Sequence, residues 1–210
     1  MIKLSKTSKL DGIKSWSLQA LDTCPGSKDN NGELVPACAG CYATSGNYRF
    51  STVKAPREHN REDWKREDWV NDMIAALDND RYFRWFDSGD VYDVKLAEKI
   101  YQVIKATPRC RHWLPTRMLK FKKFEFVLNK INALENAVVR FSSDSIHGEY
   151  DARHGSTIIP NDQTPTSAKI CHAYQNNGTC NGCRSCWDKQ TPIIAYVAHG
   201  RKMIKLTEEK

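Results

Sequence analysis

Two cysteines separated by two residues, Cys38 and Cys41, constrain this chain more than any other feature of its sequence. Their thiolates can reach one metal centre because the short loop between them folds back on itself. Cys24 lies upstream in the same long loop and supplies a third sulfur. Three protein ligands on a cubane iron–sulfur cluster would leave one iron open to an exogenous ligand, much as a catalytic zinc keeps an open position. We therefore predict an iron–sulfur cluster at these three cysteines, with half of a zinc site or simple packing of the thiols as the alternatives.

A second group of cysteines lies in the C-terminal part of the chain and consists of Cys171, Cys180, Cys183 and Cys186. The last three follow one another at two-residue gaps, as in the bacterial ferredoxin motif, and Cys171 is the natural fourth ligand. Four thiolates also suffice for a tetrahedral structural zinc, so zinc is the alternative to a cluster. In either case we expect a closed, structural centre. The eighth cysteine, Cys110, is interpreted as a packed thiol.

Length and composition predict one globular domain rather than a secreted or membrane protein. Of the 210 residues, 40% are hydrophobic and 27% are charged, as in an ordinary soluble domain. No apolar run approaches the length of a membrane span, and the N-terminus lacks the apolar segment of a signal peptide. Without an export signal, eight cysteines favour metal binding over disulfides. We therefore expect a cytoplasmic protein with no membrane partner.

The charge and the aromatic residues leave a second class of function open. The formal net charge is +7, which favours an anionic partner or cofactor. Six tryptophans and eight tyrosines add to this, because aromatic side chains stack on bases. The alternative to an enzyme is therefore a non-enzymatic module, stabilised by an iron–sulfur cluster or zinc, that contacts nucleic acid or a host protein.

The periodicity of the hydrophobic residues predicts strands that alternate with helices. The predicted strands cover residues 15–20, 82–86, 112–115, 137–141, 156–159 and 193–197. Amphipathic helices are predicted over residues 62–77, around 96–104 and around 124–131. This alternation is typical of a parallel sheet with helical crossovers. We therefore predict one α/β domain over residues 1–210, with a cysteine-rich insertion at 145–191.

Polar or metal-binding residues follow most of the predicted strands. They are Cys24, Asp87 with Asp90, Thr116 with Arg117, residues 142–144, and His199. Each of them alone could be a helix cap or a turn residue. In parallel α/β folds, however, the loops that follow the strands gather at one mouth, where ligands bind. We therefore expect these residues to line one site.

Several short motifs resemble those of the gene product 88 family, a small phage-encoded family that is itself similar to radical S-adenosylmethionine (SAM) enzymes. The motifs are Cys24-Pro25-Gly26, Cys41-Tyr42-Ala43, Asp87-Ser88-Gly89-Asp90 and Cys183-Arg184-Ser185-Cys186-Trp187. The Cys38-x-x-Cys41 pair after the first strand also resembles the cluster loop of radical SAM enzymes. The alternating elements are similar to their partial (β/α) barrel, here with about six parallel strands.

The resemblance implies a cofactor and a chemistry. In radical SAM enzymes a three-cysteine [4Fe–4S] cluster binds SAM through its open iron and cleaves it reductively to a 5′-deoxyadenosyl radical. Carried over to this chain, the implied cofactor-binding residues are Tyr42, Ser88, Gly89 and Asp144. The residues implied to position a substrate are Asp87, Asp90 and Arg117. The resemblance also implies a phage origin, which would place the protein in the host cytoplasm.

The cluster loop differs from the usual radical SAM motif in two ways. Thirteen residues, rather than three, separate Cys24 from Cys38. They include the turn residues 29–32, so this loop has room for a hairpin excursion. Gly40 stands where radical SAM enzymes often carry an aromatic residue against the adenine.

Overall fold

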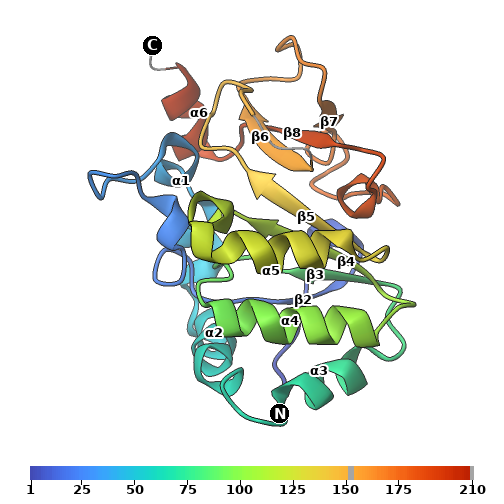
Figure 1. The fold of residues 1–210 in the computed structure, drawn as a ribbon. Coiled ribbons are helices and arrows are strands. Elements are labelled where there is room, and N and C mark those ends of the chain that lie inside the picture. Colours follow the sequence, from blue (N-terminus) through green and yellow to red (C-terminus); the bar gives the residue numbers. More distant parts are fainter. Residues whose placement is uncertain (151–153, 209–210) are drawn as a thin grey trace.

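The computed structural model describes residues 1–150 and 154–208, which form a mixed α/β fold (Figure 1). The strands are β1 (Ser5–Lys6), β2 (Lys14–Trp16), β3 (Tyr82–Trp85), β4 (Arg111–Thr116), β5 (Ala137–Ser142), β6 (Gly155–Ile159), β7 (Lys169–Cys171) and β8 (Ile193–Val197). The helices are α1 (Pro36–Ala39), α2 (Ser51–Asp63), α3 (Trp69–Leu77), α4 (Val94–Ala106), α5 (Lys122–Ala133) and α6 (Arg201–Glu208). None of these helices is long and apolar enough to cross a membrane.

All eight strands belong to one sheet, in the order β1-β2-β3-β4-β5-β6-β8-β7. Every neighbouring pair is parallel except β1 and β2. The predicted α/β class and the six predicted strands are confirmed. The structure adds β1 and β7, which form the two edges of the sheet. Both are only two or three residues long. The strand predicted over residues 15–20 is also short in the structure, where β2 ends at Trp16.

The prediction of one helix over residues 62–77 is wrong. The structure has two helices in this part of the chain, α2 and α3, and residues 64–68 form the turn between them. The break is held by a tertiary contact, since Lys99 on α4 donates hydrogen bonds to the backbone carbonyls of Trp64 and Arg66. Trp64 caps the end of α2 and Arg66 lies in the turn, so neither carbonyl has a partner within α2. The periodicity of the sequence carries no trace of this contact.

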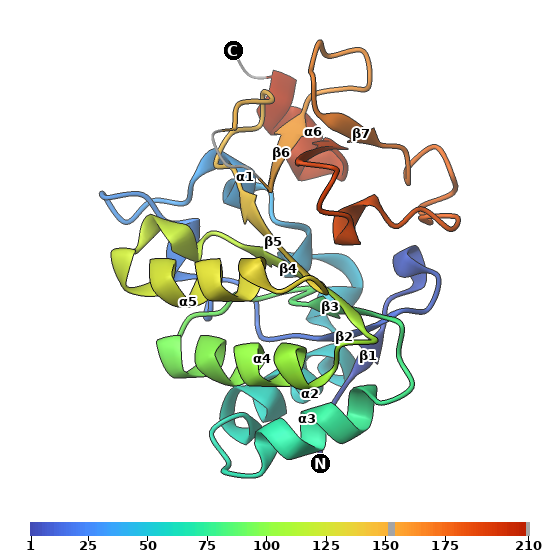
Figure 2. The same cartoon turned by 45° about the vertical axis from the view of Figure 1, so that its right-hand side comes forward.

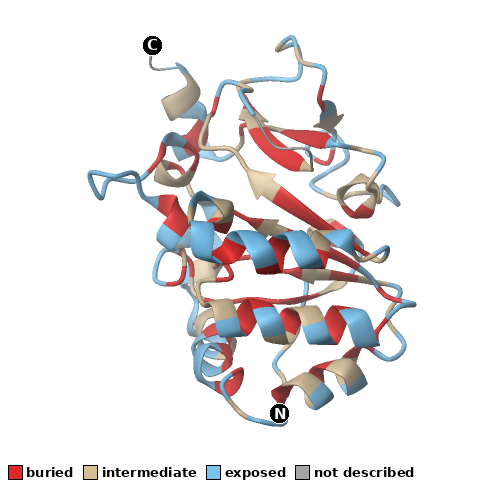
Figure 3. Cartoon of the chain, in the orientation of Figure 1, coloured by how far each residue is buried: buried red, intermediate tan, exposed pale blue. Residues whose placement is uncertain are grey.

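The main hydrophobic core lies between the sheet and helices α3, α4 and α5. Trp16, Trp69 and Trp85, from β2, α3 and β3, are all fully buried and pack edge to face or tilted on one another. The exposed sides of α4 and α5 face away from the sheet (Figure 3). Burial of this helical side leaves the other face of the sheet free to carry polar residues.

Strand register decides which residues lie on that other face. Because successive side chains alternate across a strand, residues in register with one another share a face. Arg84 on β3 is in register with Trp113 on β4. Further along the sheet, Ser142 is in register with Ser156, and Tyr196 with Ile158 and Cys171. All of these residues line one cavity.

The C-terminal strands form the upper part of the molecule and carry no packed helices comparable to α4 and α5 (Figure 2). Residues 145–191, predicted as a cysteine-rich insertion, contribute β6 and β7 to the common sheet. The loop of this segment that carries the cysteines is anchored by Arg140 on β5. This fully buried guanidinium donates five hydrogen bonds to backbone carbonyls of residues 185–192.

A cysteine-lined candidate cofactor site

A cavity of about 460 Å³ lies on the polar face of the sheet, near the carboxyl ends of the parallel strands. Six cysteines line it, three from each of the predicted groups: Cys24, Cys38, Cys41, Cys171, Cys180 and Cys186. Among the described residues, no group of three or more His, Cys, Asp or Glu side chains is gathered closely enough to hold a single metal ion. The sequence predicted two separate cysteine sites, whereas in the structure cysteines of both groups line the same cavity.

The long spacing between Cys24 and Cys38 is closed by a hairpin-like excursion. Residues 28 and 34 form an antiparallel bridge, and the Val35 N–H donates to the Ser27 carbonyl at 2.9 Å. The excursion therefore leaves and returns at nearly the same place. Cys38 then lies on the short helix α1, and the Cys41 N–H donates to its carbonyl at 3.1 Å. All three cysteines consequently reach one wall of the cavity.

The electrostatics of this first group are those of partly buried thiols beside basic groups. Burial raises the pKa of Cys24, Cys38 and Cys41 above the ordinary value. The neighbouring thiols add to the rise at Cys24 and at Cys38. Arg117 opposes the shift at Cys38 and at Cys41. Such a cation favours the thiolate, which is the form that binds a metal.

Gly40 is required because helix α6 packs directly on the loop that carries Cys38 and Cys41. A Cβ atom at this position would lie 2.7 Å from Met203 Cε and 3.0 Å from Met203 Cα. No aromatic side chain fits there. The aromatic residue of this loop is instead Tyr42, whose ring lines the cavity and is 43% exposed.

Tyr42 and Asp87 connect the loop that carries Cys38 and Cys41 to the end of β3. The Tyr42 hydroxyl donates to the Asp87 backbone carbonyl at 2.6 Å, and burial raises the pKa of Tyr42 to about 12. The Asp87 carboxylate accepts hydrogen bonds from Arg84 at 2.9 Å and from the Tyr48 hydroxyl at 2.6 Å, and Arg57 lies at 3.6 Å. Asp87, predicted to position a substrate, is thus the centre of an internal polar network.

The motif Ser88-Gly89-Asp90 forms a tight connection after β3. Phe86, just before it, has a φ of 56°, a strained conformation for a bulky residue. The Ser88 hydroxyl donates to the Leu18 carbonyl at 2.6 Å. Gly89 has a φ of 77°, and a Cβ there would lie 2.6 Å from Leu18 Cβ. Only glycine meets both requirements.

Asp90 is buried and fully engaged. Its carboxylate accepts hydrogen bonds from the Thr116 hydroxyl at 2.6 Å and from the backbone N–H groups of Val91 at 2.7 Å and Arg117 at 2.9 Å. Burial raises its pKa, although these hydrogen bonds act in the opposite direction. Asp90 lines the cavity, but its contacts fix the loops after β3 and β4 against each other.

Arg117 and Asp144 form an ion pair beside the first cysteine group. Arg117 Nη1 lies 2.8 Å from Asp144 Oδ1 and also donates to the Ser142 carbonyl at 3.0 Å. Asp144 pairs with Lys120 as well, and its backbone carbonyl accepts from the Ala37 N–H at 3.0 Å. Arg117 lines the cavity, whereas Asp144 is not among its described lining residues.

The second cysteine group surrounds Tyr196 on β8. Cys171 is in register with Tyr196, and the Cys186 sulfur lies 3.4 Å from its hydroxyl. Cys180 packs with Tyr196 against the same small hydrophobic cluster, which contains Trp113 and Trp187. Burial, and then the neighbouring thiols, raise the pKa of Cys180 to about 11.

Cys183 differs from the other three members of its predicted group. Its side chain is exposed, and it is not among the described residues that line the cavity. Its sulfur lies 3.4 Å from the Ser185 hydroxyl. Burial alone would raise the pKa of Cys183, but hydrogen bonds with Ser185 outweigh it and lower the pKa. Cys110, interpreted as a packed thiol, is buried.

A family model described as gene product 88 matches residues 2–189, which include all seven cysteines of the two groups. The chain belongs to the gene product 88 family. The match suggests a phage-type protein. No curated protein and no solved structure matches the chain.

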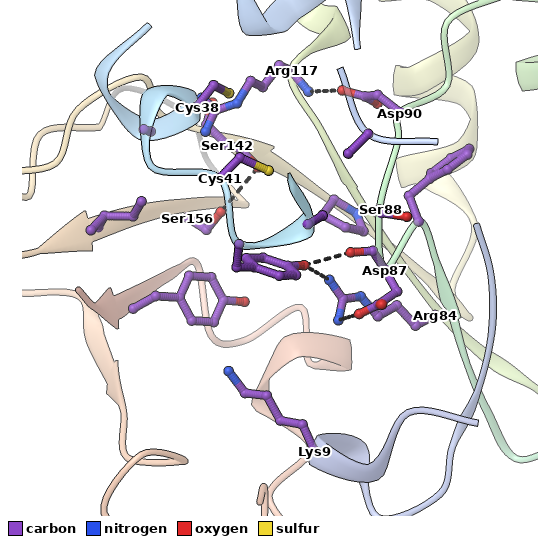
Figure 4. A pocket seen from close by; sticks show the side chains of 18 of the residues that line it. Lys9, Cys38, Cys41, Arg84, Asp87, Ser88, Asp90, Arg117, Ser142 and Ser156 are labelled. Carbon is purple, nitrogen blue, oxygen red and sulfur yellow. Dashed lines mark hydrogen bonds and ion pairs between the residues drawn. The ribbon is translucent and has the colours of Figure 1, made fainter. Parts of the chain in front are cut away.

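In this member of the gene product 88 family, the residues that line the cavity without having been predicted from the sequence include Lys9, Arg84 and Tyr196. Lys9, from the loop after β1, extends toward the cavity with its ammonium 6.0 Å from the Tyr196 ring centre (Figure 4). Arg84 and Tyr196 lie within strands and project from the polar face of the sheet. The alternation in β3, where Arg84 stands between the buried Phe83 and Trp85, is the signal that could have identified such residues.

Proposed function

We propose that this protein binds a [4Fe–4S] cluster through Cys24, Cys38 and Cys41 and uses it, with SAM, for radical chemistry on a small substrate. The observation that carries the proposal is the placement of these three cysteines on one wall of a cavity of about 460 Å³, at the mouth of a mostly parallel sheet. Its volume lies in the range of small-molecule sites. In this proposal the sheet is a radical-SAM-like partial barrel.

In this proposal the three thiols bind a cluster and not a single ion. A tetrahedral zinc with bonds of about 2.3 Å draws its sulfurs to within about 4 Å of one another. No such convergence occurs among the described residues. In a cubane each cysteine binds a different iron, so the sulfurs stay further apart around a larger object. Three thiols that line one cavity are the protein ligands that such a cluster would need.

Arg117 and Ser88 are the side chains best placed to orient SAM. Among the described residues, the hydrogen bonds of the Arg117 guanidinium all use Nη1, so Nη2 is left to bind a carboxylate. The Ser88 hydroxyl donates its hydrogen to Leu18, which leaves its oxygen lone pairs to accept from an ammonium group. Asp144, by contrast, is occupied by Arg117 and Lys120.

Tyr42 supplies the aromatic surface that Gly40 cannot. Its hydroxyl is held by Asp87, so the orientation of the ring is fixed. The ring stacks at 6.3 Å on His199, and both line the cavity. We expect the adenine to bind against this pair. When bound, the cluster and SAM would supply a reductively generated 5′-deoxyadenosyl radical. The chain's own residues would hold the two cofactors and shield them from water.

The test is anaerobic purification followed by iron and sulfide analysis. The dithionite-reduced protein should show a cluster signal in electron paramagnetic resonance (EPR), and added SAM should shift it. A variant with Cys38→Ala and Cys41→Ala should lose the SAM-sensitive signal, while Cys110→Ala should keep it. Mass spectrometry should detect 5′-deoxyadenosine after reduction with SAM. A colourless protein that contains only zinc would contradict the proposal and support the non-enzymatic binding module instead.

If the protein contains an iron–sulfur cluster but its EPR spectrum does not shift with SAM and no 5′-deoxyadenosine forms, the cluster part of the proposal stands and the radical-chemistry part is wrong. The Arg117→Gln variant separates these two parts. It should abolish the SAM-dependent shift and lower the iron content only slightly, because all three cysteine ligands remain and only the favourable charge beside Cys38 and Cys41 is lost.

A further inference from the structure

The second cysteine group differs from the closed, four-cysteine centre that its spacing predicts. Cys171, Cys180 and Cys186 line the cavity, whereas Cys183 is exposed and lies outside the described lining. The three inward cysteines gather around Tyr196, through strand register and through the 3.4 Å contact between the Cys186 sulfur and the Tyr196 hydroxyl.

The outward position of Cys183 is built into the fold. The Cys183 N–H donates to the Cys180 carbonyl at 2.9 Å, which makes the segment between them a tight turn. Asp11 fastens this turn from outside: its carboxylate accepts from the Gly182 N–H at 3.0 Å and from Arg184 at 2.7 Å. The residues on both sides of Cys183 are therefore tied to Asp11, which is not among the described residues that line the cavity.

We propose that Cys171, Cys180 and Cys186 hold a second iron–sulfur cluster with three thiolates, and that its fourth iron is open and faces the cavity shared with Cys24, Cys38 and Cys41. A cluster with three protein ligands has one iron free for a small molecule with an oxygen, nitrogen or sulfur donor. The inference rests on the proposed function in one respect, because it makes this second cluster the substrate-binding end of the same cavity.

The side chains around this end suit an open, ligand-binding centre. Lys9 extends into the cavity beside Tyr196, and its charge acts on Cys180. Arg140 donates hydrogen bonds to the carbonyls of Ser185 and Cys186, so the loop that presents Cys186 is held from below. Basic groups near a cluster stabilise its negative charge and that of an anionic ligand.

The experiment removes the first cluster and then compares the cysteines of the second group. In a background with Cys24→Ala, Cys38→Ala and Cys41→Ala, reconstitution with iron and sulfide should load about four iron atoms per chain, those of one [4Fe–4S] cluster. Adding Cys183→Ser should leave this iron content unchanged. Adding Cys180→Ser, or Cys171→Ser, should lower it at least several-fold. Cys110→Ala is the control for loss of a cysteine outside both groups.

The open iron has its own readout. Mild oxidation with ferricyanide should release the iron that no thiolate holds as Fe²⁺ and leave a three-iron cluster with its characteristic EPR signal, in the background variant and in Cys183→Ser alike. Cyanide, a small ligand for iron, should shift the EPR spectrum of the reduced four-iron form.

Equal loss of iron in Cys183→Ser and Cys180→Ser would overturn the inference, and so would a cluster that resists oxidation or binding of only zinc. If a serine variant of the inward cysteines fails to fold, Cys183→Ser and the oxidation experiment on the background protein still decide the question. Because the background lacks the first cluster, failure of the proposed SAM chemistry would not affect any of these results.

Discussion

Arg140 is the side chain whose removal should reveal most about how the cavity is held together. It projects from the centre of β5, is fully buried, and forms no ion pair with a carboxylate among the described residues. Its charge is satisfied by backbone carbonyls alone. The guanidinium donates at 2.7 Å to Ser185, at 2.9 Å to Cys186, Asp188 and Thr191, and at 3.2 Å to Pro192. The planar guanidinium thus holds the whole turn that leads into β8.

The cost of Arg140→Met follows from these contacts. A hydrogen bond from a charged donor contributes about 1.5–3 kcal/mol, but burying the guanidinium costs several kcal/mol. Loss of five such bonds, with the carbonyls left unsatisfied in the interior, should lower the free energy of unfolding by about 3–5 kcal/mol. That is a large part of the stability of a typical domain and corresponds to a fall in Tm of roughly 10 °C.

The assay is urea unfolding of the metal-free protein, with Arg109→Met as the control because Arg109 is exposed. Arg140→Lys should recover only part of the loss, since an ammonium has three donors and cannot reproduce the planar fork. Reconstituted Arg140→Met should also lose iron at the second cysteine group while the first group remains loaded. If Arg140→Met unfolds within about 1 kcal/mol of the Arg109→Met control, the reasoning is refuted.

Three further predictions concern the scaffold. Gly89→Ala combines a φ of 77° with a Cβ contact of 2.6 Å, so it should lower the free energy of unfolding by roughly 2–4 kcal/mol. The control Gly32→Ala, with a φ of 81° in open space, should lower it by about 1 kcal/mol. Equal losses of the two variants in urea unfolding would contradict this prediction. Gly40→Ala should cost about 1–3 kcal/mol through overpacking against Met203 and should lower iron loading at the first cysteine group. Burial lowers the pKa of His112 to about 3, below its unfolded value of about 6.5. The stability that depends on neutral His112 is therefore complete above pH ~6.5 and is lost as the pH falls, by about 2 kcal/mol at pH 5; His112→Gln should flatten this part of the profile, and an unchanged profile would count against it.

The sequence by itself determined the sheet and the identity of the candidate site. The six predicted strands follow from local alternation, which reflects burial on one side of a strand and is therefore visible in neighbouring residues. The cysteine pairs at two-residue gaps are equally local, because a short loop decides whether two thiolates can reach one centre. For the same reason the turn residues 29–32 predicted the excursion that brings Cys24 and Cys38 together.

Only the tertiary structure decided which of these residues face the cavity. Asp90 and Asp144 carry the charges expected of ligand-binding residues, yet both are occupied by neighbouring loops. Such partners are distant in sequence, so no local pattern records them. Arg84 lies on the cavity wall for the complementary reason: its strand position sets its direction, and only the register of the sheet shows what it faces.

The two cysteine groups show most clearly which features depend on local sequence and which depend on tertiary packing. Spacing predicted that Cys180, Cys183 and Cys186 bind one metal centre, because the distance along the chain limits the distance in space. Spacing could not show that Asp11, about 170 residues away in the sequence, holds the turn around Cys183 outward. Nor could it place both groups on one cavity, because that depends on how far the sheet curves between β3 and β8. Local chemistry follows from the order of residues, whereas the meeting of distant groups follows from packing.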